Sequence, residues 1–169
     1  MNRLFGAQRV APVLVSWGIA PSVALQFEIE AKRDGAKAIE AEHMLLALTT
    51  NSDEHAAKLL HEVGLDHERL AFALQEERRR TLAFAGMKAP DKRLVEATEL
   101  DSTLSLGTSA KAAVKRAVTG ARHEHHRVHL RSTDLLAGIL EAELGTVPRA
   151  LAIAGVDRAT LIARAWGSE

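Results

Sequence analysis

The feature that most constrains the fold of this 169-residue chain is an internal repeat. The stretch from Ile39 to Leu48 aligns with the stretch from Leu130 to Ile139, a displacement of 91 positions (39 to 130). Upstream the displacement becomes 90, which indicates a one-residue insertion near 125–129. Because the match extends over more than one segment, it predicts a duplicated structural unit. The downstream pairs at the same displacement are Leu60 with Leu151, Gly64 with Gly155, Leu65 with Val156, Asp66 with Asp157, and Leu70 with Leu161.

Each unit is predicted to form four helices, because apolar residues recur at helical spacing and no segment alternates with period two. In the first unit we expect helices over about 19–34 and 41–49, a third ending before Gly64, and a fourth running from Asp66 towards Arg80. Gly35 is expected to stop the first helix. We therefore predict an all-α fold without strands. The remaining predicted caps are Asn51, Ser52 or Asp53, Thr108 or Ser109, Ser132 or Thr133, Thr146, and Asp157.

The predicted organisation has four parts: an N-terminal extension over 1–17, a first repeat over 18–85, a linker over 86–106 and a second repeat over 107–169. The linker is identified by its Gly, Pro, Ser and Thr residues and a run of charges, and a short helix is expected over 93–98. Since a four-helix unit of this size buries little surface alone, we expect the two tandem repeats to pack about a pseudo-twofold axis.

Composition excludes several classes of function. Lys plus Arg and Asp plus Glu are equal at 22 each, so no net charge attracts nucleic acid or an anionic membrane surface. The absence of cysteine excludes disulfides, thiolate zinc sites and cysteine nucleophiles, and it fits a cytoplasmic protein. Hydrophobic residues make up 47% of the chain, which is enough to build an aliphatic core.

The uncharged stretch from Val10 to Phe27, preceded by Arg3 and Arg9, has some features of a signal peptide. Pro12, Gly18 and Pro21 interrupt it, which argues against a transmembrane helix. Its second half also belongs to the first predicted helix, which cleavage would destroy. We therefore expect a cytoplasmic protein.

One segment carries a family resemblance. Gly35 to Leu48 reads GAKAIEAEHMLLAL and resembles the N-terminal repeat of Clp unfoldases, in which a glycine and a short loop lead to Gly-Thr-Glu-His and an Ile-Leu-Leu-Gly-Leu helix. Ala56 to Leu60 and Val63 to Leu65 resemble the next helix of that repeat and its Leu-Gly-Val turn. The double repeat covers about 18–166.

The resemblance implies a non-catalytic domain that sits above an AAA+ unfolding ring and recruits substrates and adaptor proteins. In the Clp C branch such domains bind phosphorylated arginine. The sequence contains no Gly-x-x-x-x-Gly-Lys-[Ser/Thr] motif and leaves no residues for a nucleotide domain. We therefore expect a standalone adaptor, anti-adaptor or decoy that binds proteins or peptides of the Clp machinery, without nucleic acid, membrane or cofactor.

The resemblance also implies a ligand pocket in each repeat, where the glutamate of Gly-Thr-Glu-His faces the guanidinium, a pairing with strong charge-assisted hydrogen bonds. Glu42 matches that glutamate, but Glu40 and Ala41 replace the Gly-Thr, which adds a charge and removes a hydroxyl. In the second repeat Ser132 keeps a hydroxyl, whereas Thr133 replaces the glutamate. The first pocket is thus expected to be altered and the second to be at most a remnant.

Other constellations have ordinary structural readings. Arg122 to His129 contains four of the eight histidines, and His125 and His129 have i, i+4 spacing, but the pattern is not His-Glu-x-x-His. His43 is expected to fix a loop, because no nucleophile stands in a triad or elbow pattern. Arg78, Arg79 and Arg80 suit the last turns of a helix. We predict no catalytic residue and no metal site.

Two alternatives to the adaptor hypothesis remain. The loss of the second glutamate favours a helical regulator or structural partner that kept the fold and lost its ligand pockets. The histidine cluster leaves room for a metal-dependent enzyme, which metal analysis of untagged protein would test.

Overall fold

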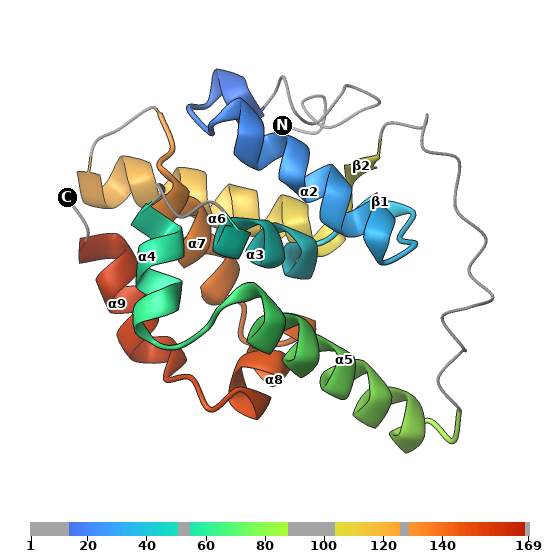
Figure 1. Ribbon diagram of the computed structural model, residues 1–169. Helices are drawn as coiled ribbons and strands as arrows, with labels where there is room; N and C mark the ends of the chain where they lie inside the picture. The colour runs from blue at the N-terminus through green and yellow to red at the C-terminus, as the bar shows by residue number, and fades with distance from the viewer. Residues whose placement is uncertain (1–13, 51–54, 88–103, 126–128, 168–169) are drawn as a thin grey trace.

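The computed structural model (Figure 1) describes residues 14–50, 55–87, 104–125 and 129–167. The fold is all-α, as predicted, with one very short pair of strands. The elements run in the order α2 (Pro21–Arg33), β1 (Ala38–Ile39), α3 (Ala41–Thr50), α4 (His55–Glu62), α5 (His67–Phe84), β2 (Ser105–Leu106), α6 (Thr108–His125), α7 (Ser132–Leu140), α8 (Thr146–Ile153) and α9 (Arg158–Gly167).

Several helix ends form as the sequence predicts. Gly35, at φ +69°, follows the last turn of α2, which a left-handed residue commonly terminates. Asp66 caps α5 by accepting a hydrogen bond of 2.8 Å from the backbone N–H of Arg69. Asp157 caps α9 in the same way, by accepting from the backbone N–H of Ala159 at 3.1 Å. These polar residues satisfy N–H groups that have no partner within the helix.

Other predicted caps are wrong. Thr108 and Ser132 are the first residues of α6 and α7, so Ser109 and Thr133 also lie inside those helices. The N-terminus of α7 is instead closed by Asp134, whose carboxylate accepts from the backbone N–H of Arg131 at 2.8 Å. An aspartate three positions into a helix can satisfy this N–H. Thr146 is likewise the first residue of α8. The predicted caps at 51–53 and the short helix over 93–98 lie outside the described residues.

The prediction of no strands is also wrong at one point. Ala38–Ile39 pairs in parallel with Ser105–Leu106, and the backbone N–H of Gly107 donates to the carbonyl of Ile39 at 2.8 Å. Two residues are too few to produce an alternating pattern, which explains why periodicity missed them. The pairing joins the segment before α3 to the segment before α6. At the corresponding place in the second half, the N–H of Leu130 donates to the carbonyl of Trp17.

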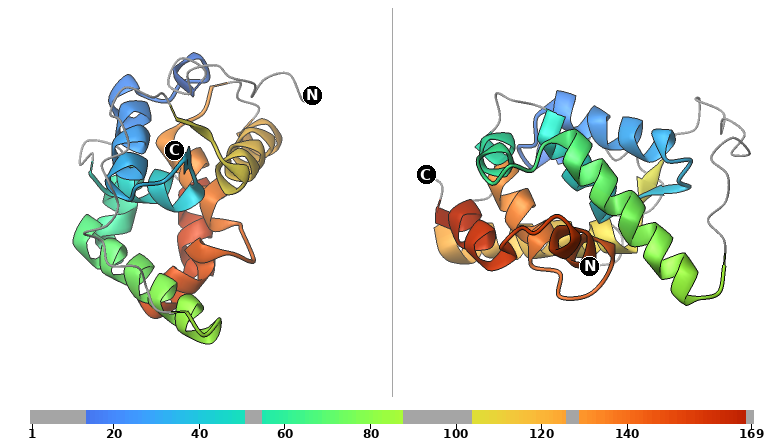
Figure 2. Two further views of the ribbon diagram at one scale, coloured as in Figure 1. Left: turned by 90° about the vertical axis from the view of Figure 1, so that its right-hand side faces the viewer. Right: turned by 60° about the horizontal axis from the view of Figure 1, so that its bottom comes forward.

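The core is continuous between the two halves, with α3 and α7 near its centre (Figure 2). Met44 and Leu48 on α3 and Leu136 and Ile139 on α7 are fully buried. Every residue of α7 is buried, as expected for a helix that is surrounded on all sides. Removing this much aliphatic surface from water is the main source of stability.

Helices of the two halves also pack against each other: α5 against α8, α4 against α9, and α3 against α7. The last three helices of each half begin 91 residues apart, at Ala41 and Ser132, His55 and Thr146, and His67 and Arg158. This spacing agrees with a duplicated unit. The pseudo-twofold axis and the predicted domain boundaries remain predictions. None of the helices in the described ranges combines the length and apolar character that a bilayer-spanning segment requires.

Candidate functional site

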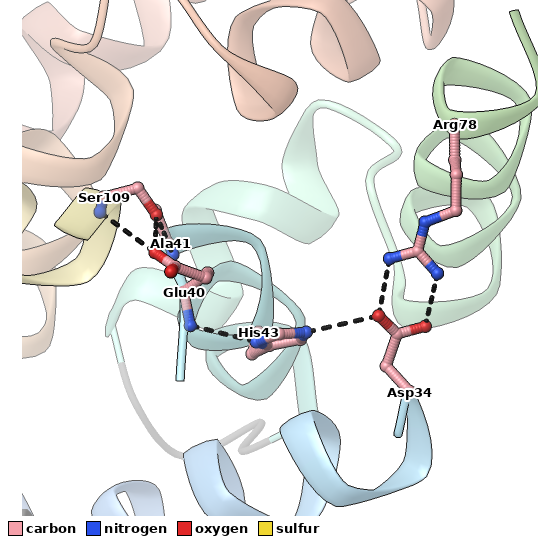
Figure 3. A network of polar contacts seen from close by, with 6 residues as sticks. All are labelled: Asp34, Glu40, Ala41, His43, Arg78 and Ser109. Carbon is pink, nitrogen blue, oxygen red and sulfur yellow. Dashed lines mark hydrogen bonds and ion pairs between the residues drawn. The ribbon is translucent and has the colours of Figure 1, made fainter. Parts of the chain in front are cut away.

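The N-terminus of α3 is held by a chain of polar contacts that passes through His43 (Figure 3). The side chain of His43 is almost fully buried. Its Nδ1 accepts from the backbone N–H of Glu40 at 3.0 Å, so its Nε2 carries the proton and faces the Asp34 carboxylate at 3.5 Å. His43 thus fixes the loop between α2 and α3, the role expected from the sequence.

Asp34 continues this chain to α5. Both of its oxygens accept from the guanidinium of Arg78, at 2.8 and 2.6 Å. Burial alone would raise the pKa of Asp34, but the hydrogen bonds from His43 and Arg78 and the charge of Arg78 outweigh it and hold the pKa well below its usual range. The pKa of Arg78 is raised by the same hydrogen bonds, in spite of burial, and also by the charges of Asp34, Glu42 and Glu77. Asp34 and Arg78 therefore stay ionised at neutral pH.

Glu40 and Ala41 lie on the other side of the α3 terminus, against α6 (Figure 3). The Glu40 carboxylate accepts from the backbone N–H of Ser109 at 2.9 Å and from its hydroxyl at 2.5 Å. The Ser109 hydroxyl oxygen in turn accepts from the backbone N–H of Ala41 at 2.8 Å. The two helix termini thus cap each other. Since the first turn of α6 has no acidic residue, Glu40 supplies the negative charge that a helix N-terminus favours.

Gly107 makes room for this arrangement. A Cβ atom at Gly107 would lie 1.9 Å from a carboxylate oxygen of Glu40, a distance that would force Glu40 to move. The carboxylate of Glu40 is therefore directed to α6 and does not share a pocket with Glu42.

Glu42 faces a groove between α3 and α5. It lines a cavity of about 180 Å³ together with the apolar side chains of Leu46, Ala71 and Leu74. Other lining residues, Asp34, His43 and Arg78, are those that fix the α3 terminus. Glu42 is half-buried, and within the described parts of the chain no hydrogen bond or ion pair reaches its carboxylate. We call this cavity the Glu42 groove.

The remaining charges of the Glu42 groove are largely paired. Glu30 is 3% exposed and accepts from Gln26 at 2.7 Å and from Arg33 at 3.1 Å. His67 Nε2 lies 3.2 Å from the second oxygen of Glu30, within ion-pair distance but without hydrogen-bond geometry. The Asp34 carboxylate is likewise committed to Arg78 and His43. Glu42 is therefore the carboxylate that the groove leaves available to a cation.

The counterpart residues of the second half are covered by protein. Ser132 and Thr133 are 8% and 2% exposed. The backbone N–H of Ala56 donates to the Ser132 hydroxyl at 3.4 Å, so this hydroxyl holds the start of α4. Asp134, at the position of the motif histidine, is fully buried and caps α7. The structure thus brings Glu40 and Ala41 together, places Glu42 on a separate face, and encloses Ser132 and Thr133.

In the described part of the chain, the histidine cluster forms no set of metal ligands. α6 ends at His125, residues 126–128 lie outside the described ranges, and the side chain of His125 is not described. Among the described residues no three His, Asp or Glu side chains gather as metal ligands do.

No sequence pattern indicated that Asp34, Arg78 and Ser109 belong to this site. Asp34 was visible only as the residue before the helix-stopping Gly35, and Arg78 only as one of three basic residues near a helix end. The contacts join residues 44 positions apart (Asp34 and Arg78) and 69 positions apart (Glu40 and Ser109). Local patterns carry no information about such separations.

The fold and the groove define the chain as a small all-helical domain with a charged cavity on one face. The family model for the Clp repeat (R) N-terminal domain matches residues 26–151. This match covers most of the chain, from within α2 to within α8. The chain belongs to the Clp N-terminal domain family, which confirms the resemblance found in the sequence.

A solved structure supports the fold. The N-terminal domain of the caseinolytic protease associated chaperone ClpD from Arabidopsis thaliana is similar to this chain with a TM-score of 0.62 and 19% sequence identity. The similarity covers 85% of this chain and 87% of the other. At this identity the comparison shows a shared fold. No curated protein matches the sequence significantly.

Proposed function

We propose that this chain is a non-catalytic protein- and peptide-binding module of the Clp protease machinery, acting in the cytoplasm as an adaptor, anti-adaptor or decoy. The observation that carries the proposal is the half-buried Glu42 carboxylate, which has no bonded partner among the described residues and faces a cavity. Family membership supports the same reading, because it places the chain among Clp N-terminal domains.

The Glu42 groove suits a guanidinium side chain on a peptide. A carboxylate binds a guanidinium through paired, charge-assisted hydrogen bonds, and Leu46, Ala71 and Leu74 offer apolar surface to the methylene stem. Arg78 is committed to Asp34, and Glu40 is bonded to Ser109, so neither is the primary contact. We therefore propose an arginine or phosphoarginine side chain as ligand, with a Clp unfoldase, adaptor or degradation substrate as the protein that presents it.

Calorimetric titration tests this proposal. Phosphoarginine, free arginine, and matched peptides with phosphoarginine or arginine are titrated into the full chain. We expect heat with at least one guanidinium ligand, and Glu42→Gln to weaken binding about tenfold or more, since it removes the charge from the pair. Glu68→Gln, on an exposed position of α5, is the matched control. The absence of binding, or binding that Glu42→Gln leaves unchanged, contradicts the pocket.

Affinity capture tests the partners separately. Wild-type protein is used as bait against purified Clp unfoldase with and without substrate. Retention that Glu42→Gln weakens supports the adaptor or decoy role. If neither the unfoldase nor its substrates are retained, the link to the Clp machinery fails, whatever the titration shows.

The second candidate is a helical regulator or structural partner that has lost its ligand pockets. Two observations favour it: Glu40 is consumed in capping α6, and Ser132 and Thr133 are enclosed. Under this hypothesis no guanidinium ligand binds, whereas a Clp partner is still captured, and Glu42→Gln has no effect on capture.

A further inference from the structure

The outer face of α5 carries two strongly exposed aromatic side chains. Phe72 is 67% exposed and Phe84 is 97% exposed. Glu76 and Arg80 lie between them at successive four-residue steps, so the four side chains form one ridge along the helix. We call this set, Phe72, Glu76, Arg80 and Phe84, the α5 ridge. None of the four lines the Glu42 groove.

Phe84 is open to solvent because the end of α5 extends beyond the helices that it packs against, whereas Phe72 and Glu76 lie in the packed part of the helix, and the Glu76 side chain is 18% exposed. Leu70, Ala73, Leu74 and Glu77 are the buried residues of α5. The C-terminal part of the helix projects away from α3 and α8 (Figures 1 and 2), and the residues from Ala83 to Met87 are all exposed. Two aromatic side chains this exposed on one helix, with Phe84 at its projecting end, mark a candidate interaction surface.

The order of residues along the ridge is self-complementary. The order of these residues is symmetric about Arg78. Reversing the direction of α5 puts Phe72 at the position of Phe84 and Glu76 at the position of Arg80. Two copies of α5 laid antiparallel would therefore place aromatic rings against aromatic rings and carboxylates against guanidinium groups. A twofold axis produces this arrangement, because it brings one surface against an identical one.

We propose that the α5 ridge is a homodimer interface, in which a second copy of this chain docks through its own α5 in antiparallel orientation. The two aromatic pairs form the ends of the interface, and Glu76 and Arg80 form its centre. Binding of an unrelated protein would not require this symmetric order of residues along α5. The self-complementary order thus selects a second copy as the occupant.

Glu76 and Arg80 are placed to form ion pairs between the two copies. Arg80 is 62% exposed and donates to Glu76 of its own helix at 2.7 Å, and Arg79 donates to both oxygens of the same carboxylate at 2.8 Å. A carboxylate has about four acceptor sites, so Glu76 keeps one site on Oε2 for the partner's Arg80. In the dimer the two glutamates and their arginines form one network.

The size of the interface sets the expected strength. The 18 residues of α5 span roughly 27 Å, so a single helix pair buries an area at the low end of specific interfaces. We therefore expect a concentration-dependent dimer, with dissociation in the micromolar range or weaker.

Sedimentation velocity of the full chain from about 5 to 500 µM brackets this range. The wild-type protein is expected to shift towards twice the mass of one chain as concentration rises. Phe84→Ser and Phe72→Ser should each weaken dimerisation about tenfold or more. Leu25→Ser, which changes an exposed leucine on α2 (55% exposed), is the matched control and should dimerise like the wild type. Circular dichroism checks that each variant is folded.

Charge exchange gives the sharper test. Glu76→Arg and Arg80→Glu alone each place like charges across the axis and should weaken the dimer, whereas the double variant should restore it. A wild-type protein that stays monomeric throughout overturns the proposal. The proposal is also overturned if both phenylalanine variants still dimerise like the wild type, or if the double charge-exchange variant fails to dimerise.

Discussion

Asp34 shows how one side chain connects three segments of the protein. It lies at the end of α2. Its carboxylate faces Nε2 of His43 on α3 and accepts two hydrogen bonds from Arg78 on α5. Its side chain is 25% exposed, so these contacts act partly sheltered from water and salt. The position of Arg78 on one wall of the Glu42 groove therefore depends on Asp34.

Asp34→Asn is expected to lower the free energy of unfolding at neutral pH by about 1–3 kcal/mol, because it removes charged hydrogen bonds to Arg78. The pKa of Asp34 is lowered in the folded state, so its contribution is present above the unfolded pKa of about 4 and is lost as pH falls through the folded pKa. Urea unfolding at a series of acidic pH values should show the stability gap between wild type and variant closing as pH falls below about 4. A gap independent of pH would contradict this assignment.

At the scale of elements, helix termini are satisfied by neighbouring helices as much as by local caps. Glu40 caps α6, Ser109 caps α3, and Arg69 of α5 donates to the carbonyl of Ala154 at the end of α8 at 2.7 Å. Such contacts supply partners for terminal backbone groups and also fix how one helix meets the next.

The reciprocal cap between α3 and α6 can be measured with a double-mutant cycle. Ser109→Ala and Glu40→Ala should each lower the free energy of unfolding by about 0.5–2 kcal/mol, the usual cost of losing an N-cap. Because the two residues act on each other, the double variant should cost less than the sum of the single variants. Denaturant unfolding of the four proteins gives the coupling energy. Additive losses would show that the two caps act independently.

Gly138 tests the close approach of α6 and α7. A Cβ atom there would lie 2.5 Å from the carbonyl oxygen of Ala113 and 2.7 Å from the backbone nitrogen of Ala117. Because both obstacles are backbone atoms of α6, Gly138→Ala should push the helices apart and lower the free energy of unfolding by about 1–3 kcal/mol, although alanine favours helices. Gly167→Ala, where a Cβ meets nothing, is the control for thermal unfolding. A Gly138→Ala variant as stable as the wild type would contradict the predicted clash.

At the scale of the whole molecule, the sequence predicted the repeated helices but not how they join. The displacement of 91 and the glycine and aspartate signals placed α2 to α5 and α7 to α9 within a few residues of their observed bounds. The pairing of Ile39 with Leu106, the Asp34–Arg78 contact and the enclosure of Ser132 arise from tertiary packing, which has no local sequence signature. Glu42 was predicted from the sequence as a ligand-binding residue. The groove that it lines could not be predicted, because it depends on how α5 packs beside α3.

The continuous core predicts that the two halves unfold together. Trp17 and Trp166, one from each end of the described chain, are partly buried against that core, and the indole N–H of Trp166 donates to Glu141 at 2.9 Å. Trp166→Phe leaves Trp17, which directly precedes the first half, as the fluorescent reporter, and Trp17→Phe leaves Trp166 in the last helix of the second half. In each variant the fluorescence and the circular dichroism should give the same urea midpoint and slope, because the helices of the two halves share one hydrophobic interior. Two separate midpoints would mean that the repeats are independent folding units, and that packing across the interface between them contributes little to stability.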